Sequence, residues 1–323
     1  MRMLLILPAL FIVTLAPAAQ QGSYPVRPIR MIVPYPPAGT TDFVAREIAN
    51  NVGQALGQQI VIDNRPGAGT MLGLALGAKA PPDGYTITFG TSAGLAVNPA
   101  LGTKMQYEPL RDFVPIGLMV YVPYLLVVNP ELPVRNIREL IDLAKAQPGK
   151  LNFASPGVGT PNHLGIELLN SMAGVKFVHV PYKGGAAAVL DLVAGRVQVL
   201  FSGTPQVSSF VKLGRLRVIA VGTTRPTRVA PEFAPIADTF PGFDCNTWYG
   251  LVAPTGTPSA IISRFNIELN RTLANPAVIQ RLLDQGVEAT PGTSSAFREL
   301  IVSETERWRK VIKSAGITAE TAQ

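Results

Sequence analysis

Two segments of the chain repeat one pattern, and together they limit the folds open to it. They are Val33-Pro-Tyr-Pro-Pro-Ala-Gly-Thr-Thr-Asp42 and Ala154-Ser-Pro-Gly-Val-Gly-Thr-Pro-Asn-His163. Each begins as a strand, passes through a Gly/Pro turn and enters a predicted helix at a threonine. The first turn of such a helix presents unpaired main-chain N–H groups and a positive dipole end, which favour an anion. We therefore expect two lobes that hold one anion between them.

The rest of the chain alternates between predicted strands and helices, which is typical of an α/β fold with right-handed crossovers. Periodicity and Gly/Pro breaks predict strands over residues 29–33, 59–64, 85–89, 151–155, 177–181, 197–201, 216–221 and 247–253. They predict helices over residues 43–56, 72–79, 137–146, 160–172, 186–194, 259–273, 276–285 and 293–314. We expect each lobe to be a mostly parallel sheet flanked by helices.

Two irregular segments indicate how the lobes are divided. Residues 114–128 are apolar and β-branched but contain Pro115 and Pro123, so we interpret them as leaving the first lobe and entering the second. Residues 226–244 are rich in proline and lack periodicity, which is typical of a surface connection. We therefore predict lobe 1 over residues 19–122 and lobe 2 over 123–247. Residues 248–323 supply a return strand and C-terminal helices that complete lobe 1.

The N-terminal residues have the pattern of a secretory signal peptide. Met1-Arg-Met3 is a short basic start, and Leu4 to Leu15 is almost wholly apolar but too short to span a bilayer. Ala16-Pro-Ala18 supplies small residues at a plausible cleavage point. We therefore assign residues 1–18 to a cleaved signal peptide and expect a periplasmic protein.

The composition is that of a well-buried globular protein, with 47% hydrophobic and 15% charged residues. The formal net charge of +7 comes from scattered basic residues, so we expect no nucleic-acid partner. Cys245 is the only cysteine, which leaves no intrachain disulfide in an exported protein. Stability must therefore come from the hydrophobic cores, and we interpret Cys245 as an inert buried thiol.

The only two histidines, His163 and His179, have no Cys, His or carboxylate partner at metal-ligand spacing, so the sequence predicts no metal site. His179 lies in a β-branched segment, where a packed strand residue is expected. His163 falls in the first turn of the helix that follows the second loop. It is there either a partly exposed polar residue or a ligand contact, and the sequence leaves both open.

Gly90-Thr-Ser-Ala-Gly94 follows a predicted strand and matches the nucleophile-elbow pattern of serine hydrolases. Such an elbow needs a helix at once after the serine, and we expect Gly94 and Asn98-Pro99 to interrupt one. No histidine after His179 is present to act as the base. A hydrolase centred on Ser92 is kept as an alternative, but Thr91 and Ser92 also suit a role as hydroxyl donors at the carboxyl end of a parallel strand.

Gly67-Ala-Gly-Thr-Met-Leu-Gly73 has the wrong spacing for a dinucleotide fingerprint, and no Walker lysine pattern is present. We interpret this glycine-rich segment as a turn followed by a helix of small residues. No cofactor is expected.

Six motifs occur in the order typical of one known family. They are the two loops above together with Asn64-Arg-Pro-Gly-Ala-Gly69, Pro82-Asp-Gly-Tyr85, Val180-Pro-Tyr-Lys-Gly184 and Leu251-Val-Ala-Pro-Thr-Gly-Thr-Pro258. As a set they resemble the periplasmic solute-binding proteins of tripartite tricarboxylate transporters, also called the Bug family. The resemblance covers essentially the whole chain after residue 18. It implies a two-lobed Venus-flytrap fold with a carboxylate in the cleft, held by main-chain amides, hydroxyls and ordered waters.

The resemblance also implies a set of ligand-binding residues. Lobe 1 contributes Tyr35, Pro37, Ala38, Gly39, Thr40, Thr41, Asp42, Thr91 and Ser92. Lobe 2 contributes Ser155, Gly157, Val158, Gly159, Thr160, His163, Tyr182, Lys183 and Ser202, with Gly184 nearby.

The chain departs from the family pattern at two places. Ala38 and Thr40 stand where the family often has a run of glycines, and Ser202-Gly203 stands where it often has an aspartate. That aspartate suits a ligand amino group, so its absence argues against an amino-acid ligand.

The sequence therefore predicts a monomeric, non-enzymatic receptor that binds a mono-, di- or tricarboxylic or aromatic acid and closes on it by hinge motion. We expect membrane permease subunits as partners. A sensor that presents its bound ligand to a signalling partner has the same fold and stays open as an alternative, as does the Ser92 hydrolase.

Overall fold

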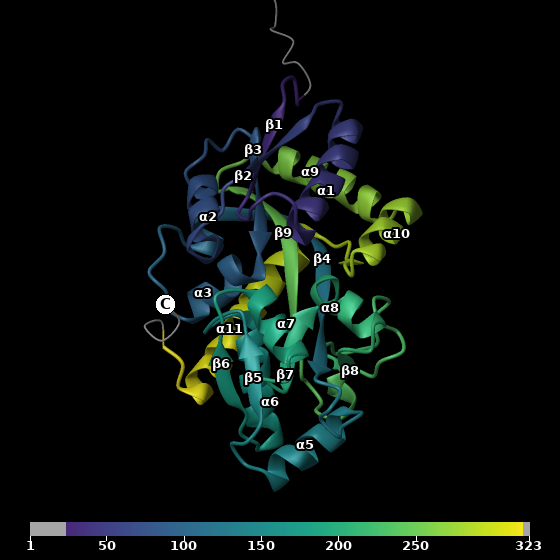
Figure 1. The fold of residues 1–323 in the computed structure, drawn as a ribbon. Helices are drawn as coiled ribbons and strands as arrows, with labels where there is room; N and C mark the ends of the chain where they lie inside the picture. Colours follow the sequence, from purple (N-terminus) through teal and green to yellow (C-terminus); the bar gives the residue numbers. More distant parts are fainter. Residues whose placement is uncertain (1–23, 319–323) are drawn as a thin grey trace, which may run out of the picture.

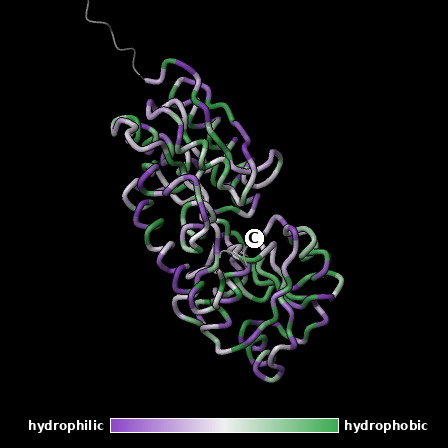
Figure 2. Tube along the Cα trace, turned by 90° about the vertical axis from the view of Figure 1, so that its left-hand side faces the viewer, coloured by the Kyte–Doolittle hydropathy of each residue, from purple (hydrophilic) through white to green (hydrophobic). Residues whose placement is uncertain are grey.

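The computed structural model describes residues 24–318, which form two lobes joined by one continuous sheet (Figure 1). Seen from the side, the lobes are stacked end to end, with hydrophobic segments inside each of them (Figure 2). The predicted signal peptide and its cleavage point lie outside the described residues. The predicted two-lobed α/β architecture is confirmed. Within residues 24–318, no helix combines the length and apolarity needed to cross a membrane.

The strands of the described residues form a single mixed sheet in the order β2-β1-β3-β9-β4-β7-β5-β6, with β8 and β10 also paired to β4. Parallel pairing is limited to β1 with β2 and β3, and to β5 with β6 and β7. The central pairs are antiparallel. The bounds are β1 Ile29–Val33, β2 Ile60–Asn64, β3 Thr86–Thr91, β4 Phe113–Val128, β5 Asn152–Ser155, β6 Val178–Pro181, β7 Val199–Gly203, β8 Arg217–Val221, β9 Asn246–Pro254 and β10 Glu288–Ala289.

Helices cover both faces of this sheet in each lobe. The α-helices are α1 Thr40–Leu56, α2 Met71–Ala78, α3 Asn98–Ala100, α4 Pro109–Asp112, α5 Ile137–Ala146, α6 Pro161–Ala173, α7 Gly185–Val193, α8 Thr204–Lys212, α9 Ser259–Leu273, α10 Pro276–Asp284 and α11 Ser294–Ala315. Three short helical segments accompany them: η1 Ala68–Thr70, η2 Ala93–Val97 and η3 Ile236–Asp238.

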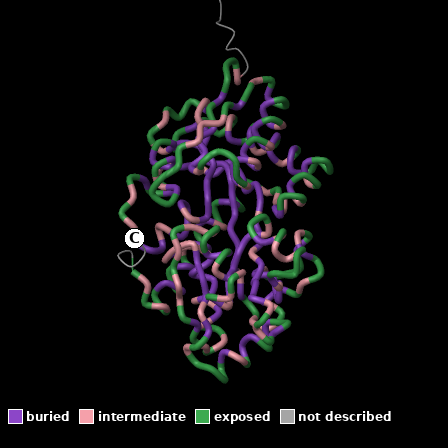
Figure 3. Tube along the Cα trace, viewed as in Figure 1, coloured by how far each residue is buried: buried purple, intermediate pink, exposed green. Residues whose placement is uncertain are grey.

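Strands β4 and β9 cross from one lobe to the other. Within β4, Pro123 pairs with Asn246 of β9, and the next residue, Tyr124, pairs with Gly203 of β7. The strand therefore changes partner at this point, which we call the hinge. All nine residues of β9 are buried, and Figure 3 shows the two strands as a buried axis through the molecule. The strand tolerates Pro115 because its register against β9 shifts between Pro115 and Gly117.

Each lobe has a hydrophobic core on both faces of its sheet. In lobe 1, α1, α9 and α10 pack on one face and α2, η2 and α11 on the other. In lobe 2, α5 and α6 cover one face and α7 and α8 the other. A further hydrophobic cluster joins the lobes, because it contains Leu164 of α6 together with Trp308 and Ile312 of α11 and Val97 of η2. Helix α11 therefore packs against both lobes beside the hinge.

Three sequence expectations are wrong. The sheet of each lobe is mixed and not mostly parallel, because β4 and β9 pair antiparallel with their neighbours. A helical segment follows Ser92 at once, since η2 runs directly into α3 despite Gly94 and Pro99. Gly94 is required there for space, because a Cβ would lie 2.1 Å from Leu74 Cδ1. Helix α8 was not expected after the strand at 197–201. Its start, Gly203-Thr204-Pro205, repeats the Gly159-Thr160-Pro161 sequence that opens α6.

Candidate functional site

Two connected cavities lie between the lobes beside the hinge. The inner one has a volume of about 560 Å³ and the outer one about 910 Å³. Both are lined by Gly69, Ala93, Pro156, Thr160 and Pro161, so they form one cleft. The lining comes from the loops before α1, α2, α6, α7 and α8 and from the hinge strands β4 and β9. The two loops singled out in the sequence thus lie in the two walls of one cleft.

The first loop, residues 34–42, is held from behind by Asp42. Its carboxylate accepts hydrogen bonds from the Ala38 N–H (3.2 Å), Asn64 Nδ2 (3.0 Å) and Arg46 Nε (2.8 Å). Burial opposes ionisation, but these hydrogen bonds hold the pKa of Asp42 below its usual range. Asp42 is buried, and its hydrogen bonds hold the loop in place from behind. Tyr35, Thr40 and Thr41 line the cavity.

A second loop of lobe 1, at residues 66–70, also forms a wall of the cleft. From the sequence we interpreted it only as a turn. Pro66, Gly67, Gly69 and Thr70 line the inner cavity. Ala38, Ala68 and Thr70 are the non-glycine residues with positive φ in the described chain, at +61°, +47° and +80°. All three belong to the two lobe 1 loops of the cleft, so backbone strain is concentrated where the cavity is formed.

The hinge strands contribute aromatic side chains to the lining of the inner cavity. Tyr124 of β4 and Tyr249 of β9 line the inner cavity together with Tyr35, whose ring centroid lies 6.4 Å from that of Tyr249. Burial raises the pKa of all three phenols, so their hydroxyls stay protonated near neutral pH. Thr41 Oγ1 donates to the Tyr249 hydroxyl at 3.3 Å. No local sequence pattern marks Tyr124 or Tyr249 as site residues, since only the crossing of β4 and β9 brings them here.

The lobe 2 wall is formed by the segment 155–163 and by the starts of α7 and α8. Thr160 is the N-cap of α6 and accepts from the His163 N–H, and Pro161 occupies the first helical position. Gly185 begins α7, and Gly203 and Pro205 flank the first residue of α8. Together with Thr40 of α1, four helix N-termini from the two lobes face the inner cavity.

The inner cavity is electrically neutral in its lining. No Asp, Glu, Lys, Arg or His is among the described residues that line it, and its polar groups are hydroxyls, amides and main-chain atoms. Lys183 is the one charged residue of the outer lining within the described chain. Such a cleft can hold an anion through N–H dipoles and hydroxyls, with no cationic partner to neutralise it.

The predicted site residues fall into three groups. Tyr35, Thr40, Thr41, Gly157, Val158, Gly159, Thr160, Tyr182 and Lys183 line the cleft. Asp42, Thr91, Ser92, Ser155, His163 and Ser202 are buried behind the lining, and Pro37, Ala38 and Gly39 are exposed outside it. As ligand contacts, all of these residues stay predictions.

Buried members of the second group support residues that do line the cavity. Ser202 Oγ donates to Gln206 Oε1 at 3.0 Å, and Ser92 Oγ lies 2.6 Å from Thr247 Oγ1. Ser92 has no histidine partner among the described residues, so the geometry gives it no base for nucleophilic catalysis. Its hydroxyl instead fixes the Thr247 side chain at the hinge.

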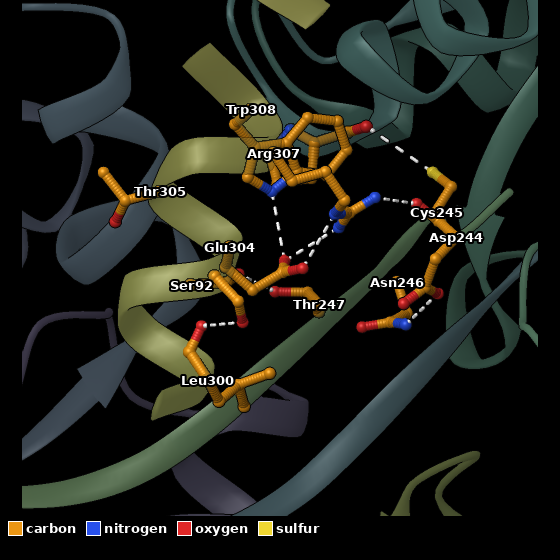
Figure 4. Close-up of polar contacts among 12 residues, drawn as sticks. Ser92, Asp244, Cys245, Asn246, Thr247, Leu300, Glu304, Thr305, Arg307 and Trp308 are labelled. Atoms are coloured by element: carbon orange, nitrogen blue, oxygen red, sulfur yellow. Dashed lines mark hydrogen bonds and ion pairs between the residues drawn. The ribbon is translucent and has the colours of Figure 1, made fainter. Parts of the chain in front are cut away.

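A cluster of charged side chains, the buried Glu304 with the half-buried Asp244 and Arg307, lies on the α11 side of the hinge (Figure 4). Arg307 donates from Nε and Nη2 to the Glu304 carboxylate, each at 2.8 Å, and from Nη1 to the Asp244 carbonyl. Its guanidinium stacks 4.1 Å from the Trp308 ring centroid. Burial raises the pKa of Asp244 to about 6, with Arg307 opposing and Glu304 adding to the shift.

Cys245, next to this cluster, is buried and connects the hinge to the site. Its Sγ donates to the Pro161 carbonyl at 3.6 Å, in the first turn of α6. Burial raises the pKa of this thiol well above its usual range, which agrees with an unreactive thiol.

A sequence-family model matches residues 44–317 of the chain, and its description is Tripartite tricarboxylate transporter family receptor. Protein BugT of Bordetella pertussis is 36% identical over 320 residues, which covers 98% of both chains.

Two solved structures combine the same fold with carboxylates in their descriptions. A protein of R. palustris described with adipate is 34% identical, with a TM-score of 0.79 over 91% of this chain and 99% of its own. MatC from Rhodopseudomonas palustris, described with bound malate, is 31% identical, with a TM-score of 0.74 over 90% of this chain and 100% of its own.

Proposed function

Because the chain belongs to the tripartite tricarboxylate transporter receptor family, we propose that it is a periplasmic receptor for a small organic carboxylate, which it delivers to membrane permease subunits. The observation that carries the proposal is the convergence of four helix N-termini on one neutral cavity. A carboxylate placed there accepts hydrogen bonds from main-chain N–H groups of both lobes. Its binding then favours the closed arrangement of the lobes, which a permease can recognise.

The lining also narrows the ligand that we propose. Three tyrosines and several prolines surround the inner cavity, and its described lining has no carboxylate to pair with a ligand amino group. We therefore expect an acid whose remaining body is uncharged and largely apolar, such as an aromatic or medium-chain acid. The relatives described with adipate and malate support the carboxylate class.

Thermal unfolding with a panel of carboxylates tests the proposal. A ligand present at 100 times its Kd should stabilise the protein by about 2.7 kcal/mol and raise Tm by several degrees. Amides or alcohols of the same carbon skeleton should give no shift. The absence of a shift with every mono-, di-, tricarboxylic and aromatic acid would contradict the proposal.

A pair of cap variants separates binding from folding. Thr160 caps α6 at the cleft, and Asn136 caps α5 at the far end of lobe 2. Thr160→Ala and Asn136→Ala should each cost about 1 kcal/mol of stability. Only Thr160→Ala should also weaken carboxylate binding, measured by calorimetry. Equal Kd values for the two variants would place the anion away from α6.

A further inference from the structure

The two histidines of the chain lie together directly behind the cleft loop at residues 155–160. The His163 and His179 rings are stacked, with centroids 3.9 Å apart, and the Phe153 ring stacks on His179 at 4.7 Å. His163 comes from α6 and His179 from β6, and neither lines the cleft. From the sequence we expected His179 to be a packed strand residue. Its ring is packed, but it also lies directly behind the cleft loop.

Each ring is hydrogen-bonded to the loop. His179 Nε2 lies 2.6 Å from Ser155 Oγ, which itself donates to the Gly157 carbonyl at 2.9 Å and accepts from the Gly157 N–H at 3.1 Å. His163 Nδ1 accepts from the Gly159 N–H at 3.0 Å. Because His163 Nδ1 accepts a hydrogen bond, the proton of this ring lies on Nε2. For His179 we infer the arrangement in which Ser155 donates to the Gly157 carbonyl and the ring donates from Nε2 to Ser155 Oγ.

These bonds decide which N–H groups of the loop remain free. The Gly157 and Gly159 N–H groups are taken by Ser155 and His163, the Thr160 N–H by the Gly157 carbonyl, and the His163 N–H by Thr160 Oγ1. Pro156 and Pro161 have none. Within residues 156–163 of the described structure, this leaves Val158 and Asn162 with N–H groups that have no partner. Val158 lines the outer cavity and Asn162 the inner one.

We propose that the stacked pair His163–His179 positions this loop, so that the Val158 and Asn162 N–H groups are the ones presented to the ligand. The proposal rests on the carboxylate-receptor function proposed above. The histidines act through Ser155, Gly157 and Gly159 and are positioning residues without contact to the ligand.

The charge state of His179 fits this role. Burial, together with the neighbouring His163, lowers the pKa of His179 to about 4, while Glu167 opposes the shift. His179 is therefore neutral near pH 7, with Nε2–H available as a donor to Ser155. The Nε2 of His163 faces Glu167 Oε1 at 3.6 Å, which agrees with a proton on that nitrogen.

Two substitutions of His179 isolate its hydrogen bond. His179→Phe keeps a ring for the stack but removes the donor, and His179→Gln keeps a donor near the Nε2 position but removes the ring. His179→Phe should weaken binding of a carboxylate from the panel by about five- to tenfold, the effect of one lost hydrogen bond. His179→Gln should recover most of that loss. In a Ser155→Ala background, His179→Phe should have no further effect on Kd.

A ligand-free readout keeps this test separate from the proposed function. Ring ¹⁵N spectra of the unmodified protein at pH 7.5 should show both histidines with the proton on Nε2. The amide signals of Gly157 and Gly159 should shift in His179→Phe and return in His179→Gln. If no carboxylate binds, the receptor proposal fails while these spectra still decide the loop proposal. A proton on Nδ1 of either ring, unchanged glycine amides, or equal Kd values for the Phe variant and the parent would overturn it.

Discussion

Replacing Asp244 by asparagine should stabilise the protein at neutral pH, because this half-buried carboxyl beside the hinge is desolvated at a cost to its charged form. Its pKa rises from 3.8 to about 6, first through burial and then through Glu304, against the attraction of Arg307. Asparagine keeps an oxygen that accepts from Asn246 Nδ2, so the local hydrogen bond survives. The substitution therefore removes the charge with little other change.

The magnitude and the sign follow from proton linkage. A folded-state pKa about two units above the ordinary value corresponds to about 3 kcal/mol of unfolding free energy. Below about pH 4 the carboxyl is protonated in both states and costs nothing. As the pH rises from about 4 to about 6, the unfolded chain releases its proton first and stability falls. Above about pH 6 the full loss is present.

Urea unfolding of Asp244→Asn and the parent between pH 4 and pH 8 measures this effect. The variant should gain about 3 kcal/mol at pH 7.5, and the gain should shrink towards zero near pH 4. Asp238→Asn is the matched control, because Asp238 is exposed and forms no ion pair within the described chain. A variant that is less stable than the parent at pH 7.5 would refute the reasoning. It would show that Arg307 stabilises the Asp244 charge by more than burial destabilises it.

Two further substitution tests and one labelling experiment probe the packing around the site. Ala38→Gly should stabilise the fold by about 1 kcal/mol, because Ala38 has a φ of +61° in the first cleft loop. If urea unfolding shows no gain in stability, no backbone strain is stored at this position. Gly165→Ala should cost about 1–3 kcal/mol, because its Cβ would lie 2.1 Å from Cys245 Sγ, and combination with Cys245→Ala should recover part of the loss. Cys245 itself should not react with a thiol reagent in the folded protein and should react fully in urea; rapid labelling of the native state would contradict its burial.

The sequence predicted most of the regular structure because its periodic segments are also the buried ones. The helices at 137–146 and 259–273 have the predicted bounds, since each combines an apolar face with clear end signals. Helix α8 was missed although Gly203-Thr204-Pro205 repeats a start signal used elsewhere in the chain. The helix after Ser92 was missed because Gly94 and Pro99 are local breakers, whereas tertiary packing around Gly94 decides the outcome there.

Only some of the residues that line the cleft could be predicted from the sequence, for a similar reason. Loops that enter helices carry a local signature, so residues such as Thr40 and Thr160 were identified from sequence. Tyr124, Tyr249 and Thr247 reach the cavity only because β4 and β9 cross at the hinge, and no local pattern encodes that crossing. The role of Ser155 depends on a ring that comes from another strand 24 residues away.

The order of strands in the sheet also sets the order in which the lobes can be completed. Strand β9 lies between β3 and β4 in the lobe 1 sheet, yet it follows all of lobe 2 in the chain. Until β9 arrives, β3 has no partner on one side and the cores around α9 and α11 cannot close. Lobe 2 is contiguous from β4 to β8 and can pair its strands first. A chain emerging from its N-terminus can therefore pair the strands of lobe 2 before those of lobe 1 are complete, and the cleft can be complete only once β9, in the last third of the sequence, has been made.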